Sequence, residues 1–165
     1  MRKYESRIAL HAQRKFSARA FALAAIRETF EETGLLLGVR SDETVKVPRG
    51  PWAAFNEAKF LPDLAELRFI GRAITPPGRP RRFDARFFTM DASAIAHRIE
   101  GVTGPNAELV ELVWMPLAQA KELDMPAVTG VMLEELDGRI ANGFAHELPV
   151  PFYSMPRGRF RRDML

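Results

Sequence analysis

Three glutamates lie close together in the first quarter of the chain, in a segment that reads Arg27-Glu28-Thr29-Phe30-Glu31-Glu32-Thr33-Gly34-Leu35. On a helix, at 100° per residue, Glu28, Glu31 and Glu32 share an arc of roughly 100°. Carboxylates this close repel one another, and neighbouring Arg27 offsets that repulsion only in part. Hard divalent cations such as Mg²⁺ bind through oxygen ligands and would offset it better. The segment therefore predicts a divalent-metal site on one helix face.

The competing interpretation of these glutamates is a solvated, charge-rich helix face, which is the more common case for an ordinary helix. The spacing argues against it, because the pattern R-E-x-x-E-E-x-G arises by chance in a chain of this length with a probability on the order of 10⁻⁴. Apolar Leu23, Ile26 and Phe30 fall on the opposite side of the same helix, and Gly34 is placed to end it. The pattern as a whole favours a functional site.

At these positions the sequence resembles the Nudix hydrolase family, whose signature ends in R-E-U-x-E-E-x-G-U, where U is a bulky apolar residue. All the charged positions, the glycine and the last apolar position match, and Thr29 departs from the first apolar one. The resemblance implies an α/β/α sandwich with a mixed sheet. It also implies that Glu28, Glu31 and Glu32 bind Mg²⁺ or Mn²⁺, that Arg27 orients these carboxylates, and that Glu31 and Glu32 take part in catalysis.

The upstream half of the family signature, a glycine and a glutamate, is not present. The corresponding positions hold Gln13 and Arg19. Either the native start lies further upstream, or this chain belongs to a branch with an insertion before the helix, in which case residues 1–17 are a variable remnant. Both explanations imply that the N-terminal part of the fold is incomplete, so that a sheet edge is left unpaired and a second copy of the chain could cover it as a homodimer.

The resemblance implies Mg²⁺-dependent hydrolysis of a pyrophosphate bond in a nucleoside diphosphate linked to a second group, X. The later segment T-P-P-G-R-P-R-R-F-D-A-R-F-F is similar to the branch with coenzyme A diphosphatase-like proteins, which suggests a coenzyme A-like or dinucleotide substrate. Two alternatives are a catalytically incomplete nucleotide-binding or scaffold domain and, with less support, a basic RNA-binding module.

Family members often supply one more carboxylate from the C-terminal third of the chain. Glu108 and Glu111 precede Trp114 here, and Glu108 lies nearer the turn-forming residues Gly104 and Pro105. A loop can carry a side chain over the helix, so Glu108 is the better candidate for a catalytic base or ligand. An ordinary surface glutamate is an equally good interpretation.

A second cluster of arginines surrounds Phe83 and provides the candidate substrate-binding residues. Guanidinium groups bind phosphate, and an aromatic ring can stack on a nucleobase. The alternative is a strand with a polar face and a basic turn. The candidates are Arg79, Arg81, Arg82, Phe83 and Arg86.

The elements that must position these residues read as a mixed α/β domain spanning residues 1–165. The pattern predicts helices over 17–33, from Pro51 to 58, over 91–100 and over 127–140. It predicts strands over 67–75, 82–90 and 109–115, of which the first two are either antiparallel neighbours or lie on either side of a site. Residues 39–48 and 101–106 are expected to form loops, and 148–165 an irregular basic tail.

Composition excludes several classes of protein. The chain has 165 residues, no Cys and a formal net charge of +3, so disulfide frameworks and thiolate chemistry are excluded and nucleic acid is not favoured as a partner. No apolar run approaches the roughly 20 residues that cross a bilayer, and the first residues lack the apolar segment of a secretory signal. We therefore expect no membrane association, a cytoplasmic location and a small-molecule partner.

Overall fold

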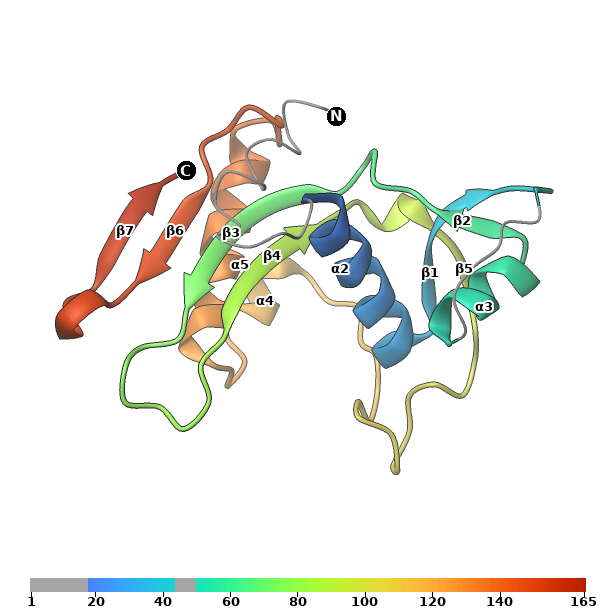
Figure 1. Ribbon diagram of the computed structural model, residues 1–165, viewed down its shortest axis with the longest axis horizontal. Coiled ribbons are helices and arrows are strands. Elements are labelled where there is room, and N and C mark those ends of the chain that lie inside the picture. The colour runs from blue at the N-terminus through green and yellow to red at the C-terminus, as the bar shows by residue number, and fades with distance from the viewer. Residues whose placement is uncertain (1–17, 44–49) are drawn as a thin grey trace. The chain divides into compact units, whose positions relative to one another are not determined.

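The computed structural model describes residues 18–43 and 50–165, so the predicted lead-in over 1–17 lies outside the described residues. The described residues form two units (Figure 1). The first unit holds 18–67, apart from the gap, and 90–113; the second holds Arg68–Thr89 and Trp114–Leu165. The prediction of one domain over 1–165 is not tested by this division.

The first unit begins with helix α2, Ala18–Thr33, which confirms the predicted helix over its described residues. Strand β1, Leu35–Arg40, pairs antiparallel with β2, Phe60–Pro62, on one side and with β5, Ile95–Arg98, on the other. Helix α3, Pro51–Glu57, begins at a proline, which has no N–H to leave unsatisfied in the first turn. The loop expected over 39–48 is wrong at its start, since β1 continues to Arg40.

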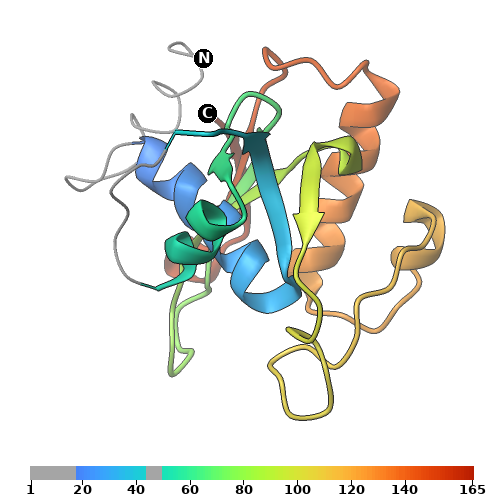
Figure 2. The ribbon, with the colours of Figure 1, turned by 90° about the vertical axis from the view of Figure 1, so that its right-hand side faces the viewer.

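The core of the first unit lies between α2, α3 and β1 (Figure 2). Ile26 and Leu36 are fully buried, and the rings of Phe30 and Phe55 meet edge to face with centroids 5.3 Å apart. Burying each such side chain contributes about 2 kcal/mol. These contacts hold the inner face of α2, so its charged face is left outward.

The second unit is built on a four-stranded mixed sheet in the order β4-β3-β6-β7. Strands β3, Arg68–Ile74, and β4, Asp84–Thr89, are antiparallel neighbours, one of the two predicted arrangements, whereas β3 and β6, Pro151–Ser154, run parallel. Strand β7, Arg161–Met164, pairs antiparallel with β6. Helix α5, Ala127–Ala141, covers one face of this sheet, where Met132 packs on Ile70 and Ala73 (Figure 1).

Three predicted elements are wrong. Residues 91–100 form a short 3₁₀ turn, Ala92–Ala94, followed by β5 rather than a helix. Residues 109–115 are irregular rather than a strand, and a short helix α4, Leu117–Ala120, follows them. The tail is not irregular, because β6 and β7 form a hairpin there around a 3₁₀ turn, Pro156–Gly158. In the described part of the chain, no helix is both long enough and apolar enough to span a membrane.

Candidate functional site

Helix α2 presents the glutamates of the signature segment on its outward face. Glu28 and Glu31 are exposed and Glu32 is half-buried, while Ile26 and Phe30 are buried on the other side. The predicted division of this helix into an apolar and an acidic face is therefore confirmed. The rigid packing of the inner face fixes the direction in which the carboxylates point.

Gly34 ends the helix and turns the chain directly into β1. Its φ is +75°, a left-handed conformation that favours glycine, and its N–H donates to the Phe30 carbonyl over 2.8 Å. The Ile99 N–H in turn donates to the Gly34 carbonyl over 2.9 Å, and a Cβ on residue 34 would overlap the Ile99 carbonyl oxygen. The glycine of the signature is thus required for the junction between the acidic helix and the sheet.

Arg27 holds two of the three carboxylates. Its Nη2 donates to Glu28 Oε1, and its Nε donates to Glu31 Oε2 over 3.3 Å. The hydrogen bond to Glu28 is the largest of the effects that raise the pKa of Arg27, which therefore stays charged. This arrangement is the one expected of a residue that orients neighbouring carboxylates.

Glu32 has a different environment from the other two glutamates. Burial raises its pKa, and the negative charges of Glu108, Glu28 and Glu31 raise it further. No described cation forms an ion pair with Glu32. Among the described residues, other carboxylates therefore dominate the electrostatic surroundings of Glu32.

The influence of Glu108 on Glu32 places these two carboxylates in electrostatic range of each other. Glu108 lies on an irregular segment, in a turn where the Gly104 N–H donates to the Leu109 carbonyl and the Ala107 N–H to the Gly104 carbonyl, both over 3.0 Å. The first unit thus combines a loop carboxylate with those of the helix. The catalytic role of Glu108 stays a prediction.

These residues suit a divalent cation by their chemistry. All the donors are carboxylate oxygens, which Mg²⁺ and Mn²⁺ prefer, and the raised pKa of Glu32 is the electrostatic condition that a bound cation relieves. They are not gathered into a ready coordination cage: among the residues that the structure describes, no three His, Asp or Glu side chains are grouped closely enough to hold a metal ion. Arg27 instead occupies Glu28 and Glu31.

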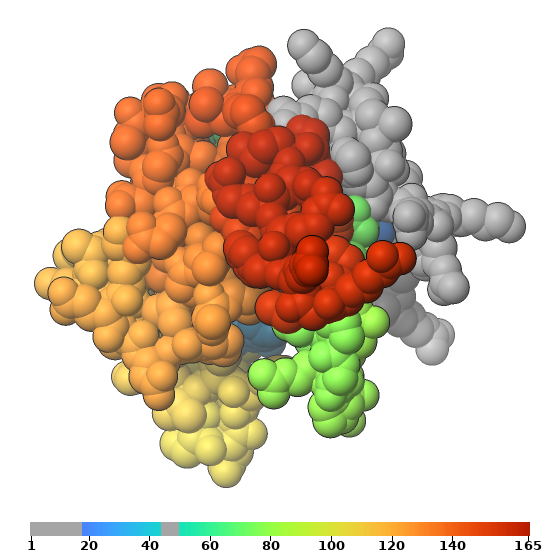
Figure 3. Space-filling view, turned by 90° about the vertical axis from the view of Figure 1, so that its left-hand side faces the viewer, coloured from blue at the N-terminus to red at the C-terminus, as the bar shows by residue number. Residues whose placement is uncertain are grey.

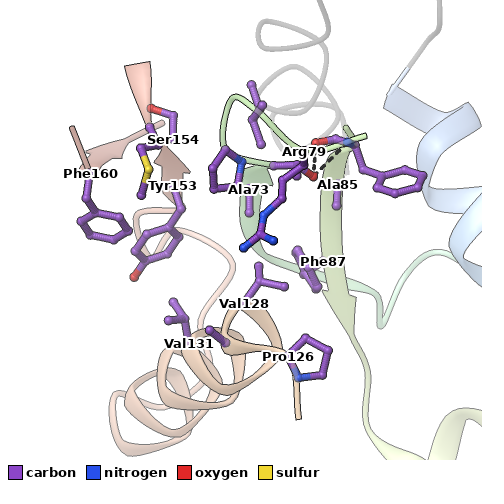
Figure 4. A pocket seen from close by; sticks show the side chains of 16 residues that line it. Ala73, Arg79, Ala85, Phe87, Pro126, Val128, Val131, Tyr153, Ser154 and Phe160 are labelled. Carbon is purple, nitrogen blue, oxygen red and sulfur yellow. Dashed lines mark hydrogen bonds between the residues drawn. The ribbon is translucent and has the colours of Figure 1, made fainter. Parts of the chain in front are cut away.

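The candidate substrate-binding residues lie in the second unit, around the connector between β3 and β4. They do not form one cluster, because their side chains have different surroundings. Arg79 and Phe83 line a pocket of about 590 Å³ on the α5 side of the sheet (Figure 4). Arg81 is exposed, and Arg82 Nε donates to the Thr75 carbonyl over 3.1 Å.

Arg86 belongs to the opposite face of the sheet, since side chains alternate along β4 and its neighbours Ala85 and Phe87 line the pocket. Its side chain is 7% exposed and lies 3.6 Å from Asp84 in an ion pair. Burial lowers the pKa of Arg86, and the nearby charge of Asp84 opposes that effect. A substrate-binding role for Arg86 stays a prediction.

Sequence reasoning missed the pocket residues that come from the C-terminal segment, among them Tyr153 and Phe160. The run of aromatic and small residues after Pro151 is a strand signal. The closely spaced prolines concealed it, although Pro151 is the first residue of β6, where a proline is tolerated.

No protein-family model and no curated protein matches the chain. Its structure is similar to the crystal structure of a Nudix hydrolase from Alicyclobacillus acidocaldarius, with a TM-score of 0.54 and 28% sequence identity, over 80% of this chain and 70% of that chain. This similarity confirms the predicted fold class, a Nudix-like α/β/α sandwich with a mixed sheet. The coenzyme A diphosphatase-like branch and the incomplete N-terminal part stay predictions.

Proposed function

We propose that this protein is a divalent-metal-dependent pyrophosphohydrolase that acts on a nucleoside diphosphate linked to a second group. The observation that carries the proposal is the row of three carboxylates on the outward face of α2, two held by Arg27 and the third, Glu32, half-buried, on a helix that Gly34 joins to the sheet. The similarity to a solved Nudix hydrolase supports a hydrolase of this general kind.

Each residue of the cluster has a role in this chemistry. Glu28, Glu31 and Glu32 would hold Mg²⁺ or Mn²⁺, and Arg27 would keep the first two in place through its hydrogen bonds. When bound, the cation would neutralise the charge of the diphosphate and activate a water molecule. Glu32 or Glu108 would accept the proton of that water, and the raised pKa of Glu32 suits that task.

The second group of the substrate is coenzyme A-like or a dinucleotide in this proposal. The support is the similarity of the arginine-rich connector to that branch of the family. Exposed Arg79 and Arg81 offer guanidinium groups for phosphate oxygens.

The test is the release of nucleoside phosphates from coenzyme A, ADP-ribose and NADH, with Mg²⁺, with Mn²⁺ and with EDTA. We expect turnover of at least one substrate only with metal, and a loss on the order of 100-fold or more in Glu31→Gln and Glu32→Gln. Glu57→Gln is the matched control, because Glu57 is exposed in the same unit on α3.

Calorimetric titration with Mn²⁺ gives a readout that does not depend on having chosen the right substrate. The wild type should bind the ion, and Glu32→Gln should bind it at least tenfold more weakly. Turnover that persists in EDTA, turnover that the glutamine variants retain, or a wild type that binds no metal would each contradict the proposal.

A further inference from the structure

The second unit contains an apolar pocket, and Arg79 is the one residue of its lining to which the proposed hydrolysis gives a role. Its floor is the α5 side of β3 and β4, where Ala73, Ala85 and Phe87 lie, and Val128 and Val131 of α5 form one wall. The aromatic rings of Tyr153 and Phe160, whose centroids are 5.8 Å apart, line the side of the pocket toward the β6–β7 hairpin (Figure 4). Figure 3 shows the three surrounding elements on one face of the protein: the β6–β7 hairpin in red, α5 in orange and the connector in green.

The pocket exists because two positions on its floor have small side chains. Ala73 and Ala85 are register partners on neighbouring strands, so only two methyl groups project from the sheet at this point of the floor. Larger residues there would fill the volume against α5. At about 590 Å³ the pocket is within the usual range for sites that enclose a small organic molecule.

The hydroxyl groups of two lining residues are already engaged. Tyr153 Oη donates to Glu135 Oε1 and accepts from Arg162 Nε, the latter over 3.0 Å. Thr75 Oγ1 accepts from the Phe83 N–H over 3.0 Å. Reading the edge of a nucleobase requires several available donors and acceptors. Beyond these two, the lining side chains offer the Ser154 hydroxyl and the Arg79 guanidinium, which together supply a single acceptor.

One charged group enters the pocket. The Arg79 side chain extends from the connector toward the centre of the space, so that its guanidinium lies among apolar side chains (Figure 4). Within the described residues no carboxylate pairs with it. Arg79 is solvent-exposed, and its guanidinium lies beside apolar walls. The pocket therefore suits a ligand that has both an anionic group and a hydrocarbon body.

We propose that this pocket binds an amphiphilic anion: an unbranched acyl or alkyl chain lies between α5 and the β6–β7 hairpin, and its carboxylate or phosphate head pairs with Arg79. The two proposals share Arg79, but this ligand needs no diphosphate and no metal, so its binding can be tested apart from the proposed hydrolysis.

The test is calorimetric titration of the full chain with decanoate, decyl phosphate and decan-1-ol, without metal. We expect both anions to bind about tenfold more tightly than the alcohol, because only they pair with the guanidinium. Whichever of decanoate and decyl phosphate binds more tightly identifies the preferred head group, carboxylate or phosphate. Arg79→Gln should abolish the preference over the alcohol, whereas Arg159→Gln should keep it, because that exposed arginine removes the same charge nearby without lining the pocket.

A second variant blocks the space itself. Val128 is 39% exposed at the start of α5, so Val128→Trp should fill the pocket without disturbing the core and should weaken all three ligands at least tenfold. Val110→Trp, at an exposed position outside the pocket, is its control. Equal affinity for decanol and decanoate, unchanged binding in Val128→Trp, no binding at all, or tighter binding of adenosine 5′-monophosphate would overturn the proposal.

Discussion

Arg72 and Asp84 form a two-pronged ion pair across neighbouring strands of the second unit. Arg72 Nε lies 2.7 Å from Asp84 Oδ1, and Arg72 Nη2 lies 2.7 Å from Oδ2. The guanidinium carbon of Arg72 is also 4.5 Å from the centre of the Phe152 ring. This one side chain therefore connects β4 to β6 through β3, on the face of the sheet opposite the apolar pocket.

Asp84→Asn should destabilise the protein by about 2 kcal/mol at pH 7, because it leaves the buried guanidinium of Arg72 without its counter-charge. Chemical denaturation measures the change. Asp163→Asn is the matched control, since its partner Arg161 is exposed and such pairs contribute little. If Asp163→Asn lost as much stability as Asp84→Asn, the buried ion pair would contribute no more than the exposed one, contrary to this prediction.

The same pair predicts a pH dependence. Burial alone would raise the pKa of Asp84, but the hydrogen bonds and charges of Arg72 and Arg86 lower it overall. A lowered pKa in the folded state means that the pair contributes stability above the ordinary Asp pKa and loses it as pH falls through the lowered value. The difference in stability between wild type and Asp84→Asn should therefore shrink in acid.

Gly34→Ala should cost about 3 kcal/mol, since it combines a positive φ with overlap between the new Cβ and the Ile99 carbonyl oxygen. Gly101→Ala separates the two causes. Gly101 also has a positive φ, of +81°, but a Cβ there has no atom within 4 Å, so we expect a loss of only about 1 kcal/mol. If thermal denaturation shows the same loss of stability in both variants, the overlap with the Ile99 carbonyl oxygen does not contribute to the loss.

Glu32→Gln should raise the Tm slightly at pH 8. The pKa of Glu32 is raised in the folded state, so its charged form opposes folding above that pKa, and the cost disappears below the ordinary Glu pKa of about 4.3. The rise should be absent at about pH 4, and Mg²⁺ should raise the Tm of the wild type more than that of the variant. A lower Tm for Glu32→Gln at pH 8, with Glu57→Gln unchanged, would refute this account.

Arg27→Lys should lower the turnover of the proposed reaction by about tenfold while changing the Tm little. A lysine keeps the charge but loses the fork that holds Glu28 and Glu31 together, and exposed pairs contribute little stability. Arg19→Lys, on the same helix and exposed, should leave turnover unchanged. Full turnover in Arg27→Lys would show that the hydrogen bonds of Arg27 to Glu28 and Glu31 are not needed for the reaction.

Features of the fold that depend on neighbouring residues could be predicted from the sequence. The alanine-rich run and the glycine that follows it predict a helix and its end, and the spacing of Glu28, Glu31 and Glu32 places them on one face. The antiparallel pairing of β3 and β4 also follows from two short strands and one proline-rich connector. These parts of the candidate site could therefore be predicted from the sequence alone.

Features that depend on distant partners could not be predicted. Residues 95–98 have helix-forming residues but pair with β1, so tertiary contact overrides local propensity. Val110 and Trp114 look like strand residues, yet their side chains are exposed. The effect of Glu108 on Glu32 and the ion pair of Arg72 with Asp84 depend on a loop path and a strand register that no local pattern encodes.

The parallel pairing of β3 with β6 has a consequence for folding kinetics. It pairs Arg72 with Phe152, positions that are 80 residues apart in the chain. The strands can meet only when this long segment closes into a loop, which costs conformational entropy. Contacts so remote in sequence slow folding, whereas α5 and the β6–β7 hairpin close locally. During synthesis on the ribosome the sheet of the second unit must therefore wait for its last strands, and until they emerge β3 presents an open edge that chaperones would have to shield.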